Sequence, residues 1–150
     1  LLPETVALLA KLPNIVGIKD ASNDLGRVSL HAALTRGEQF TQLSGEDPSS
    51  LGHRMMGGTG CISVTANIAP ELCAQMHAAF DEGDGDKARA LDQRLIHLHR
   101  AMFFAPSPSP AKYVLAKMGL CEEEVRLPIT PPDAATRARI DQALSLAGLE

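Results

Sequence analysis

Short apolar runs alternate with helical patterns along the first part of the chain. The candidate strands occupy residues 15–18, 40–43 and 61–64, and each is followed by small or polar residues. The stretches between them, 25–34 and 48–56, have the spacing of helices. Strands that are apolar on both faces are typical of a parallel sheet covered by helices. The pattern therefore predicts an α/β fold with three parallel strands joined by helical crossovers.

The rest of the pattern is helical. Three strands are fewer than a stable open sheet usually has, so we expect them to belong to a larger sheet or to an eight-stranded barrel. Such a barrel typically takes about 250 residues, and the chain has 150. We therefore expect the C-terminal portion of a barrel, or a chain that needs a partner. The further helices are predicted at 4–12, 70–80, 86–104, 111–118 and 133–147.

Composition restricts the partners more than it indicates a function. The formal net charge is -4, aromatic residues make up 3% and tryptophan is absent, which argues against nucleic-acid binding. No apolar run approaches the roughly 20 residues of a membrane span, and the start of the chain lacks a signal-peptide pattern. The three cysteines have no metal-like spacing. We expect a cytoplasmic protein without a membrane or nucleic-acid partner.

A lysine follows the first apolar run. Lys19 lies at the carboxyl end of the predicted strand, where active sites gather in parallel α/β folds. A desolvated lysine loses its proton more readily, and the neutral amine attacks carbonyl groups. The plainer interpretation is a solvated lysine paired with Asp20 or Asp24. Spacing alone leaves both interpretations open.

The second strand ends in a glycine and two carboxylates. Gly45 would let a ligand approach the backbone closely. We interpret Glu46 and Asp47 as acidic residues at a helix N-terminus rather than as an acid–base pair. The glycines of 57–60 precede a strand, the wrong order for a phosphate-binding loop. No metal set is predicted from the histidines, which we expect to be solvated or capping: His31, His53, His77, His97 and His99.

Several segments taken together resemble the dihydrodipicolinate synthase family, and the resemblance spans nearly the whole chain. It implies the C-terminal part of a (β/α)8 TIM barrel, with strands six to eight in residues 1–69. Residues 70–150 would hold the final barrel helix and a C-terminal helical segment. The segments are IVGIKDAS at 15–22, LSGED at 43–47, GGTGCISVTAN at 57–67, PSPSPAK at 106–112 and LPITP at 127–131.

The resemblance also implies a chemistry. Lys19 would form a Schiff base with pyruvate, the backbone of Ile62 would meet the pyruvyl group, and Gly45 would line the same pocket. The resulting enamine would condense with aspartate semialdehyde, the 4-hydroxy-tetrahydrodipicolinate synthase reaction of lysine and diaminopimelate biosynthesis. The enzyme would be an aldolase-type lyase without metal or other cofactor. The complete protein would be a homotetramer.

Other features of the family have no counterpart in this sequence. Its proton-relay tyrosine, two threonines and substrate-binding arginine belong to the first half of the barrel, and the sole tyrosine here, Tyr113, lies in the helical region. We therefore expect a fragment that is inactive alone. The alternatives are a sibling aldolase, such as N-acetylneuraminate lyase or a keto-deoxy sugar-acid aldolase, and a non-catalytic half-barrel that binds a partner.

Overall fold

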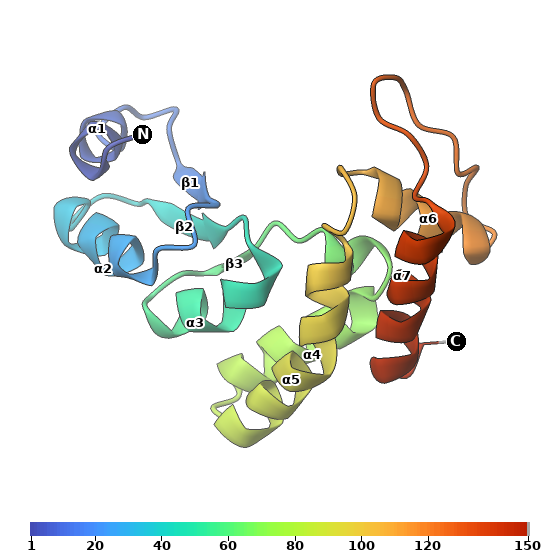
Figure 1. Cartoon of the computed structure of the whole chain (residues 1–150). Coiled ribbons are helices and arrows are strands. Elements are labelled where there is room, and N and C mark those ends of the chain that lie inside the picture. The colour runs from blue at the N-terminus through green and yellow to red at the C-terminus, as the bar shows by residue number, and fades with distance from the viewer. Residues whose placement is uncertain (150) are drawn as a thin grey trace. The chain divides into compact units, whose positions relative to one another are not determined.

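The computed structural model describes residues 1–149 and divides the chain into two compact units (Figure 1). Unit 1 covers Leu1–Ser63, and unit 2 begins at Val64. Unit 1 holds all three strands, and unit 2 holds the long helices. The sequence predicted a boundary after residue 69, between the barrel units and the helical region. That boundary concerns the complete barrel and stays a prediction.

Unit 1 is a parallel three-stranded sheet with short helices. The strands are β1 (Gly17–Asp20), β2 (Thr41–Ser44) and β3 (Gly60–Cys61), in the order β1-β2-β3. In the register, Lys19 faces Leu43 across β1 and β2. The parallel crossovers confirm the predicted alternation of strand and helix. The helices of this unit are α1 (Pro3–Leu9), α2 (Leu25–Leu34), the 3-10 turn η1 (Asp47–Ser49) and α3 (Ser50–Met55).

The strands are shifted from the apolar runs that predicted them. β1 was predicted at 15–18 and lies at Gly17–Asp20, so Lys19 and Asp20 belong to the strand itself. The reason is backbone pairing, since the Gly45 N–H donates to the Asp20 carbonyl at 2.8 Å. β3 has only 2 residues, where a run at 61–64 was predicted. Apolarity marks burial, whereas the neighbouring strand determines pairing.

The predicted fold class needs correction. The described residues 1–149 form an open sheet of three strands, and unit 2 is helical. The chain by itself is therefore an open α/β unit followed by a helical unit, and the fold class that named it as strands six to eight of a barrel was wrong for this structure. The local strand–helix order was read correctly, but the numbering of strands within a larger barrel has no support in this sheet.

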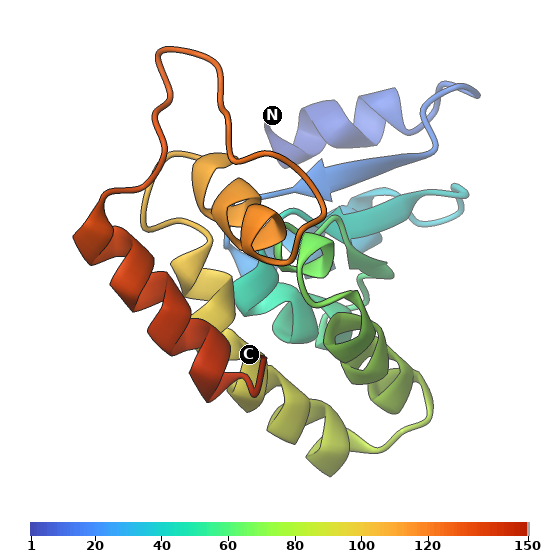
Figure 2. The same ribbon diagram turned by 90° about the vertical axis from the view of Figure 1, so that its right-hand side faces the viewer.

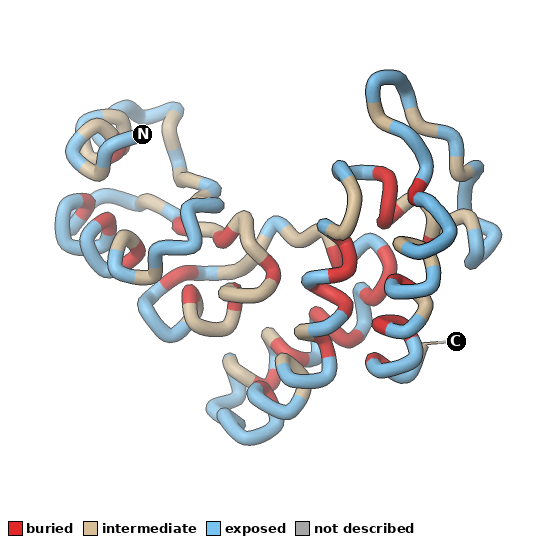
Figure 3. Tube along the Cα trace, in the orientation of Figure 1, coloured by how far each residue is buried: buried red, intermediate tan, exposed pale blue. Residues whose placement is uncertain are grey.

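Unit 2 is a set of helices around an apolar core. After the 3-10 turn η2 (Thr65–Asn67), α5 (Gly85–Ala101) packs against both α4 (Pro70–Asp81) and α7 (Ala134–Leu146) (Figures 1 and 2). Buried positions follow the inward sides of α4 and α5 (Figure 3). No helix within 1–149 is long and apolar enough to cross a membrane. The long helices are α4 (Pro70–Asp81), α5 (Gly85–Ala101), α6 (Ser109–Lys117) and α7 (Ala134–Leu146).

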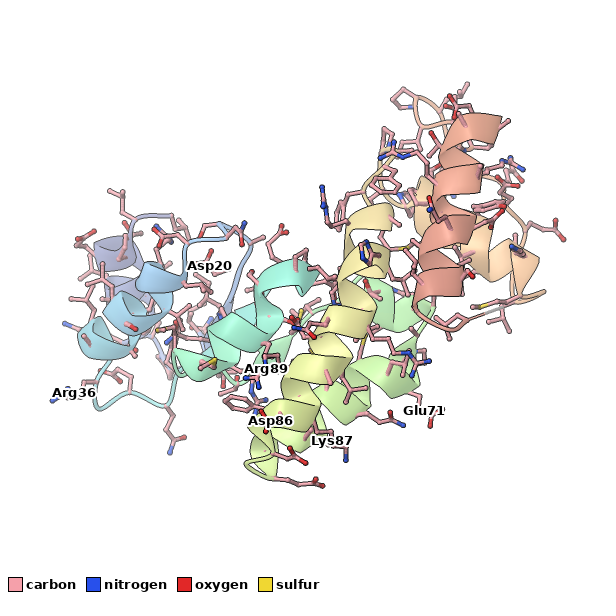
Figure 4. The ribbon with its side chains drawn as sticks, turned by 60° about the horizontal axis from the view of Figure 1, so that its bottom comes forward. Asp20, Arg36, Glu71, Asp86, Lys87 and Arg89 are labelled. Atoms are coloured by element: carbon pink, nitrogen blue, oxygen red, sulfur yellow. The ribbon has the colours of Figure 1, made fainter. Side chains whose placement is uncertain are left out.

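Local chemistry explains where these helices begin. The carboxylates of Asp84 and Asp133 accept the backbone N–H groups of Lys87 and Thr136, at 3.0 and 2.8 Å, and cap α5 and α7. Asp86 and Arg89 then form an ion pair on the surface of α5 (Figure 4). The predicted helices of this region are confirmed to within a few residues at their ends.

Candidate active site

The three predicted site residues lie at the same end of three adjacent strands. Lys19 is in β1, Gly45 follows β2 directly, and Ile62 follows β3 directly. Backbone hydrogen bonds join these ends: Gly45 N–H donates to the Asp20 carbonyl at 2.8 Å, and Ile62 N–H donates to the Ser44 carbonyl at 2.8 Å. Because the strands are parallel, their carboxyl ends meet at one edge of the sheet. The structure thus brings together residues that are 43 positions apart in the chain, from 19 to 62.

Gly45 is in direct contact with the lysine. A Cβ added at Gly45 would lie 2.7 Å from Lys19 Cε and 2.8 Å from Ala21 Cβ, closer than real Cβ contacts. The Lys19 side chain therefore runs across the Gly45 backbone, and only glycine leaves room for it. Lys19 is exposed, so its amine is accessible to a small molecule.

Ile62 forms the far side of the same edge. Its side chain is 47% exposed, and its backbone N–H is engaged with the Ser44 carbonyl. The strand predicted through residue 64 ends at Cys61, so Ile62 lies in the turn that follows β3 rather than inside the strand. Ile62 therefore lies at the same end of the sheet as Lys19, with β2 between their strands.

A buried carboxylate lies behind the lysine. Asp20 accepts the Ser22 N–H at 2.8 Å and the Arg27 Nε–H at 3.1 Å, and its side chain is only 10% exposed. Burial acts to raise the pKa of Asp20, but the hydrogen bonds from Ser22 and Arg27 outweigh it and hold the pKa below its ordinary value. The Asp20 carboxylate is therefore ionised near neutral pH. Its position in unit 1 is labelled in Figure 4.

Two histidines are buried on the same side of the sheet. His31 is 0% and His53 3% exposed, and His31 Nδ1 lies 4.0 Å from Asp20 Oδ2. Burial lowers the pKa of both imidazoles; Arg27 lowers that of His31 further, while Asp20 opposes the shift in both. The sequence interpretation of solvated or capping histidines was wrong for this pair. Their spacing of three residues from the buried Val28 and Ser50 is the signal that would have indicated burial.

The loop after β2 is held by its own side chains. Ser44, 1% exposed, donates its hydroxyl to the Glu46 carbonyl at 2.9 Å and accepts the Glu46 N–H at 3.1 Å. Asp47 begins η1 and is buried, with the Cys61 Sγ 4.0 Å from its Oδ1. The interpretation of Asp47 as a residue of a helical N-terminus agrees with this position. These contacts fix the loop that carries Gly45.

Metal-ligating side chains do not gather at this edge or elsewhere in the described chain. Within residues 1–149, no group of three or more histidine, cysteine, aspartate and glutamate residues is arranged to hold a metal ion. In unit 2, His99 is buried and its Nδ1 lies 2.8 Å from the Thr65 hydroxyl. That histidine was also predicted to be solvated or capping, and its burial corrects the prediction.

Unit 1 is a parallel α/β sheet with Lys19 and Gly45 at its strand ends, where the active sites of parallel α/β enzymes gather. The model of the dihydrodipicolinate synthetase family matches residues 1–147, and the chain belongs to that family. It is 68% identical over 148 residues to the 4-hydroxy-tetrahydrodipicolinate synthase of Hyphomonas neptunium, covering 98% of this chain and 50% of the relative. The corresponding enzyme of Ruegeria pomeroyi is 53% identical, again covering 98% and 50%.

A solved structure agrees with this assignment. The chloride-inhibited dihydrodipicolinate synthase of Acinetobacter baumannii, complexed with pyruvate, superposes with a TM-score of 0.92 at 36% identity, covering 99% of this chain and 50% of that one. The chain thus spans about half the length of the relatives it matches. The family match shows that the chain belongs to the family, and the coverage shows that it spans about half of each relative. The predicted fold class is therefore wrong as a description of this chain. The assignment to C-terminal strands six to eight is accordingly withdrawn.

Proposed function

We propose that this chain carries the pyruvate-binding lysine of a 4-hydroxy-tetrahydrodipicolinate synthase. The observation that carries the proposal is the position of Lys19 beside Gly45 at the carboxyl ends of β1 and β2, with the lysine stem close to the glycine. Ile62 follows β3 at the same end of the sheet. Support also comes from the relatives of that name and from the relative whose structure is described as complexed with pyruvate. Because the chain spans half their length, the activity is proposed for the complete protein.

The proposed reaction begins at the lysine. The Lys19 amine adds to the ketone of pyruvate, and loss of water gives a protonated imine. The imine withdraws electrons, so the methyl group loses a proton and an enamine forms. The enamine carbon attacks the aldehyde of aspartate semialdehyde and forms a carbon–carbon bond. Cyclisation then releases the product and returns the free amine, so no redox partner or metal enters the balance.

The other two residues contribute shape and polarity. Gly45 keeps a Cβ out of the space that the lysine crosses, where it would lie 2.7 Å from Cε. The proposed role of Ile62 is a backbone contact with the pyruvyl group, although its own N–H already donates to the Ser44 carbonyl at 2.8 Å. The substrate carboxylate needs polar contacts once water leaves, and other groups of the complete site are proposed to donate to it. The acid–base residue that moves the methyl proton has no candidate among these three. We propose that the other half of the protein supplies it, and that this chain alone does not turn over.

A chimera tests the function directly. In it, these 150 residues replace the matching region of the Hyphomonas neptunium relative, which is 68% identical. We expect the chimera to condense pyruvate with aspartate semialdehyde, and a Lys19→Ala chimera to be inactive. The matched control is Lys11→Ala, which removes an exposed lysine of the same unit. Preference for a sugar acid over aspartate semialdehyde would instead favour a sibling aldolase. A folded chimera inert toward every keto acid would contradict the proposal.

A further inference from the structure

Lys19 and Asp20 are consecutive residues of one strand, so their side chains point to opposite faces of the sheet. Asp20 contacts Arg27 and His31, both of α2, and therefore points to the face that this helix covers. Lys19 points to the other face, where its stem crosses Gly45. An aspartate on the covered face can act on the substrate only through the lysine beside it.

The Asp20 carboxylate is held from two directions. The Ser22 N–H, 2.8 Å away, ties it to the turn after β1, and the Arg27 Nε–H, 3.1 Å away, ties it to α2. Arg27 itself donates through Nη2 to the Leu1 carbonyl at 2.9 Å. Charge-assisted hydrogen bonds of this kind are about twice as strong as neutral ones. The strand end is thus anchored to the helix as well as to the neighbouring strand.

The Asp20 main chain fixes the other side of the lysine. Its carbonyl accepts the Gly45 N–H at 2.8 Å, which holds the Gly45 backbone against the Lys19 stem. One residue therefore anchors the lysine-bearing strand on the covered face and positions the glycine on the substrate face. Rotation of the Asp20 peptide would move Gly45 and the lysine together.

We propose that Asp20 is a positioning residue for Lys19, acting through Arg27 and the Gly45 backbone to hold the amine where pyruvate can react. This inference rests on the proposed function. Loss of the anchor leaves pyruvate binding largely intact and slows imine formation, because the amine spends less time in reacting geometry. A displacement of about 1 Å can cost on the order of a hundredfold in rate.

The test is the rate of imine formation in the full-length chimera. Pyruvate is mixed with protein, borohydride is added at set times, and the trapped fraction is measured by intact mass. Asp20→Asn is expected to lower the maximal rate about tenfold or more with little change in the pyruvate concentration that gives half that rate. Arg27→Gln is expected to act in the same direction, and the double variant to be no slower than Asp20→Asn alone. That non-additivity is the signature of a shared anchor.

The matched control is Asp24→Asn in the same loop. Asp24 caps α2 through the Gly26 N–H at 3.0 Å, and asparagine caps a helix about as well as aspartate. Its rate should stay within about twofold of the unchanged chimera. Thermal unfolding of each variant gives the folded fraction by which rates are corrected. If Asp20→Asn does not fold, Arg27→Gln carries the comparison, because it leaves the Ser22 bond in place.

The outcomes separate this inference from the function it rests on. Unchanged maximal rates in both variants, with a normal adduct in the unchanged chimera, would overturn the positioning role and leave the function standing. A raised half-maximal concentration at unchanged maximal rate would overturn it as well, because that pattern belongs to binding. No adduct in the unchanged chimera would overturn both.

Discussion

The two units are built around different interiors. Unit 1 buries few apolar side chains, namely Val6, Ala10 and Val28. Its other fully enclosed positions are polar: His31, Thr35, Gln42, Ser44, Asp47, Ser50 and His53. Unit 2 buries mostly apolar side chains, among them Leu72, Met76, Leu95, Leu98, Met102, Val114, Ile140 and Leu144.

The unit with the larger apolar core is therefore not the unit that carries Lys19. Apolar burial stabilises unit 2 without directional contacts. Unit 1 buries polar groups, of which Thr35, Gln42 and Ser44 are hydrogen-bonded. The ring nitrogens of His31 and His53, by contrast, have no hydrogen-bond partner among the described residues 1–149. Unit 1 also leaves large apolar side chains in solvent, such as Leu1 at 79%, Val16 at 69% and Leu2 at 68% exposure. Unit 1, which carries Lys19, therefore has the smaller apolar core, and its stability depends more on charge and pH.

The largest expected effect comes from truncating the unit 2 core. Leu95 is 0% exposed, so Leu95→Ala should lower the free energy of unfolding by about 2–5 kcal/mol. Urea unfolding followed by circular dichroism measures the change. Leu120→Ala, at a position 69% exposed, is the control and should change little. Equal losses in the two variants would contradict the apolar core described for unit 2.

Gly45→Ala should affect chemistry in unit 1 more than stability. The new Cβ would lie 2.7 Å from Lys19 Cε and displace the lysine stem, so we expect at least about a tenfold slower borohydride trapping of pyruvate. Gly85→Ala is the matched control, because an added Cβ there meets nothing within 4 Å. Wild-type trapping by Gly45→Ala would show that the lysine does not cross this glycine.

Mild acid should weaken unit 1 first. The pKa of His31 and of His53 lies below the ordinary value of 6.5, so the unfolded state takes up protons before the folded state does. Stability is therefore present above pH 6.5 and is lost as the pH falls below it. The lowered pKa of Asp20 adds a second loss at more acid pH, below its ordinary value of 3.8.

Hydrogen exchange resolves this effect by region. Amides of β1 and α2 should lose protection between neutral pH and about pH 5.5, after correction for the intrinsic exchange rate. Replacement of both histidines by glutamine should flatten the response, because glutamine does not titrate. Protection in unit 1 that rises on acidification would contradict the assigned direction of the histidine pKa values.

The smallest expected effect concerns the link between α6 and α7. The Tyr113 hydroxyl donates to the Asp141 carboxylate at 3.0 Å, so Tyr113→Phe should cost about 1 kcal/mol of unfolding free energy. The loss should be small, because the Lys117 amine also donates to the Asp141 carboxylate at 2.8 Å and remains in place. It should be confined to unit 2, to which all three residues belong. Chemical denaturation gives the value, and altered pyruvate trapping in this variant would show that the units are not independent.

Sequence patterns predicted the elements better than their exact pairing. The helix at Leu25–Leu34 was predicted in full, because Asp24 caps it and its apolar residues have helical spacing. Strand limits shifted by up to three residues, since pairing with the neighbouring strand determines where each strand ends. The place of the strands in a larger fold was misassigned, because the apolar pattern of a strand does not show its number in a sheet.

The candidate site was predictable in part. Lys19 was singled out because it follows an apolar run at a predicted strand end, whereas the roles of Gly45 and Ile62 came from the family resemblance. The structure puts all three at the same end of parallel strands, and their roles stay predictions. The close approach of the Lys19 side chain to Gly45 could not be predicted from the sequence, because a glycine does not show which neighbour occupies the space beside it. The buried polar layer was missed because its residues follow no apolar pattern, and the only signal for the histidines was their three-residue spacing from Val28 and Ser50.

Peptide mapping of the borohydride-trapped chimera tests the central claim most directly. Lys19 should carry the pyruvate-derived mass, with none on the chain's other lysines, Lys11, Lys87, Lys112 and Lys117. Lys19→Ala should abolish that adduct while the protein remains folded by circular dichroism. An adduct on another lysine, or an unmodified Lys19 in a folded and complete protein, would contradict the assignment of this edge as the pyruvate site.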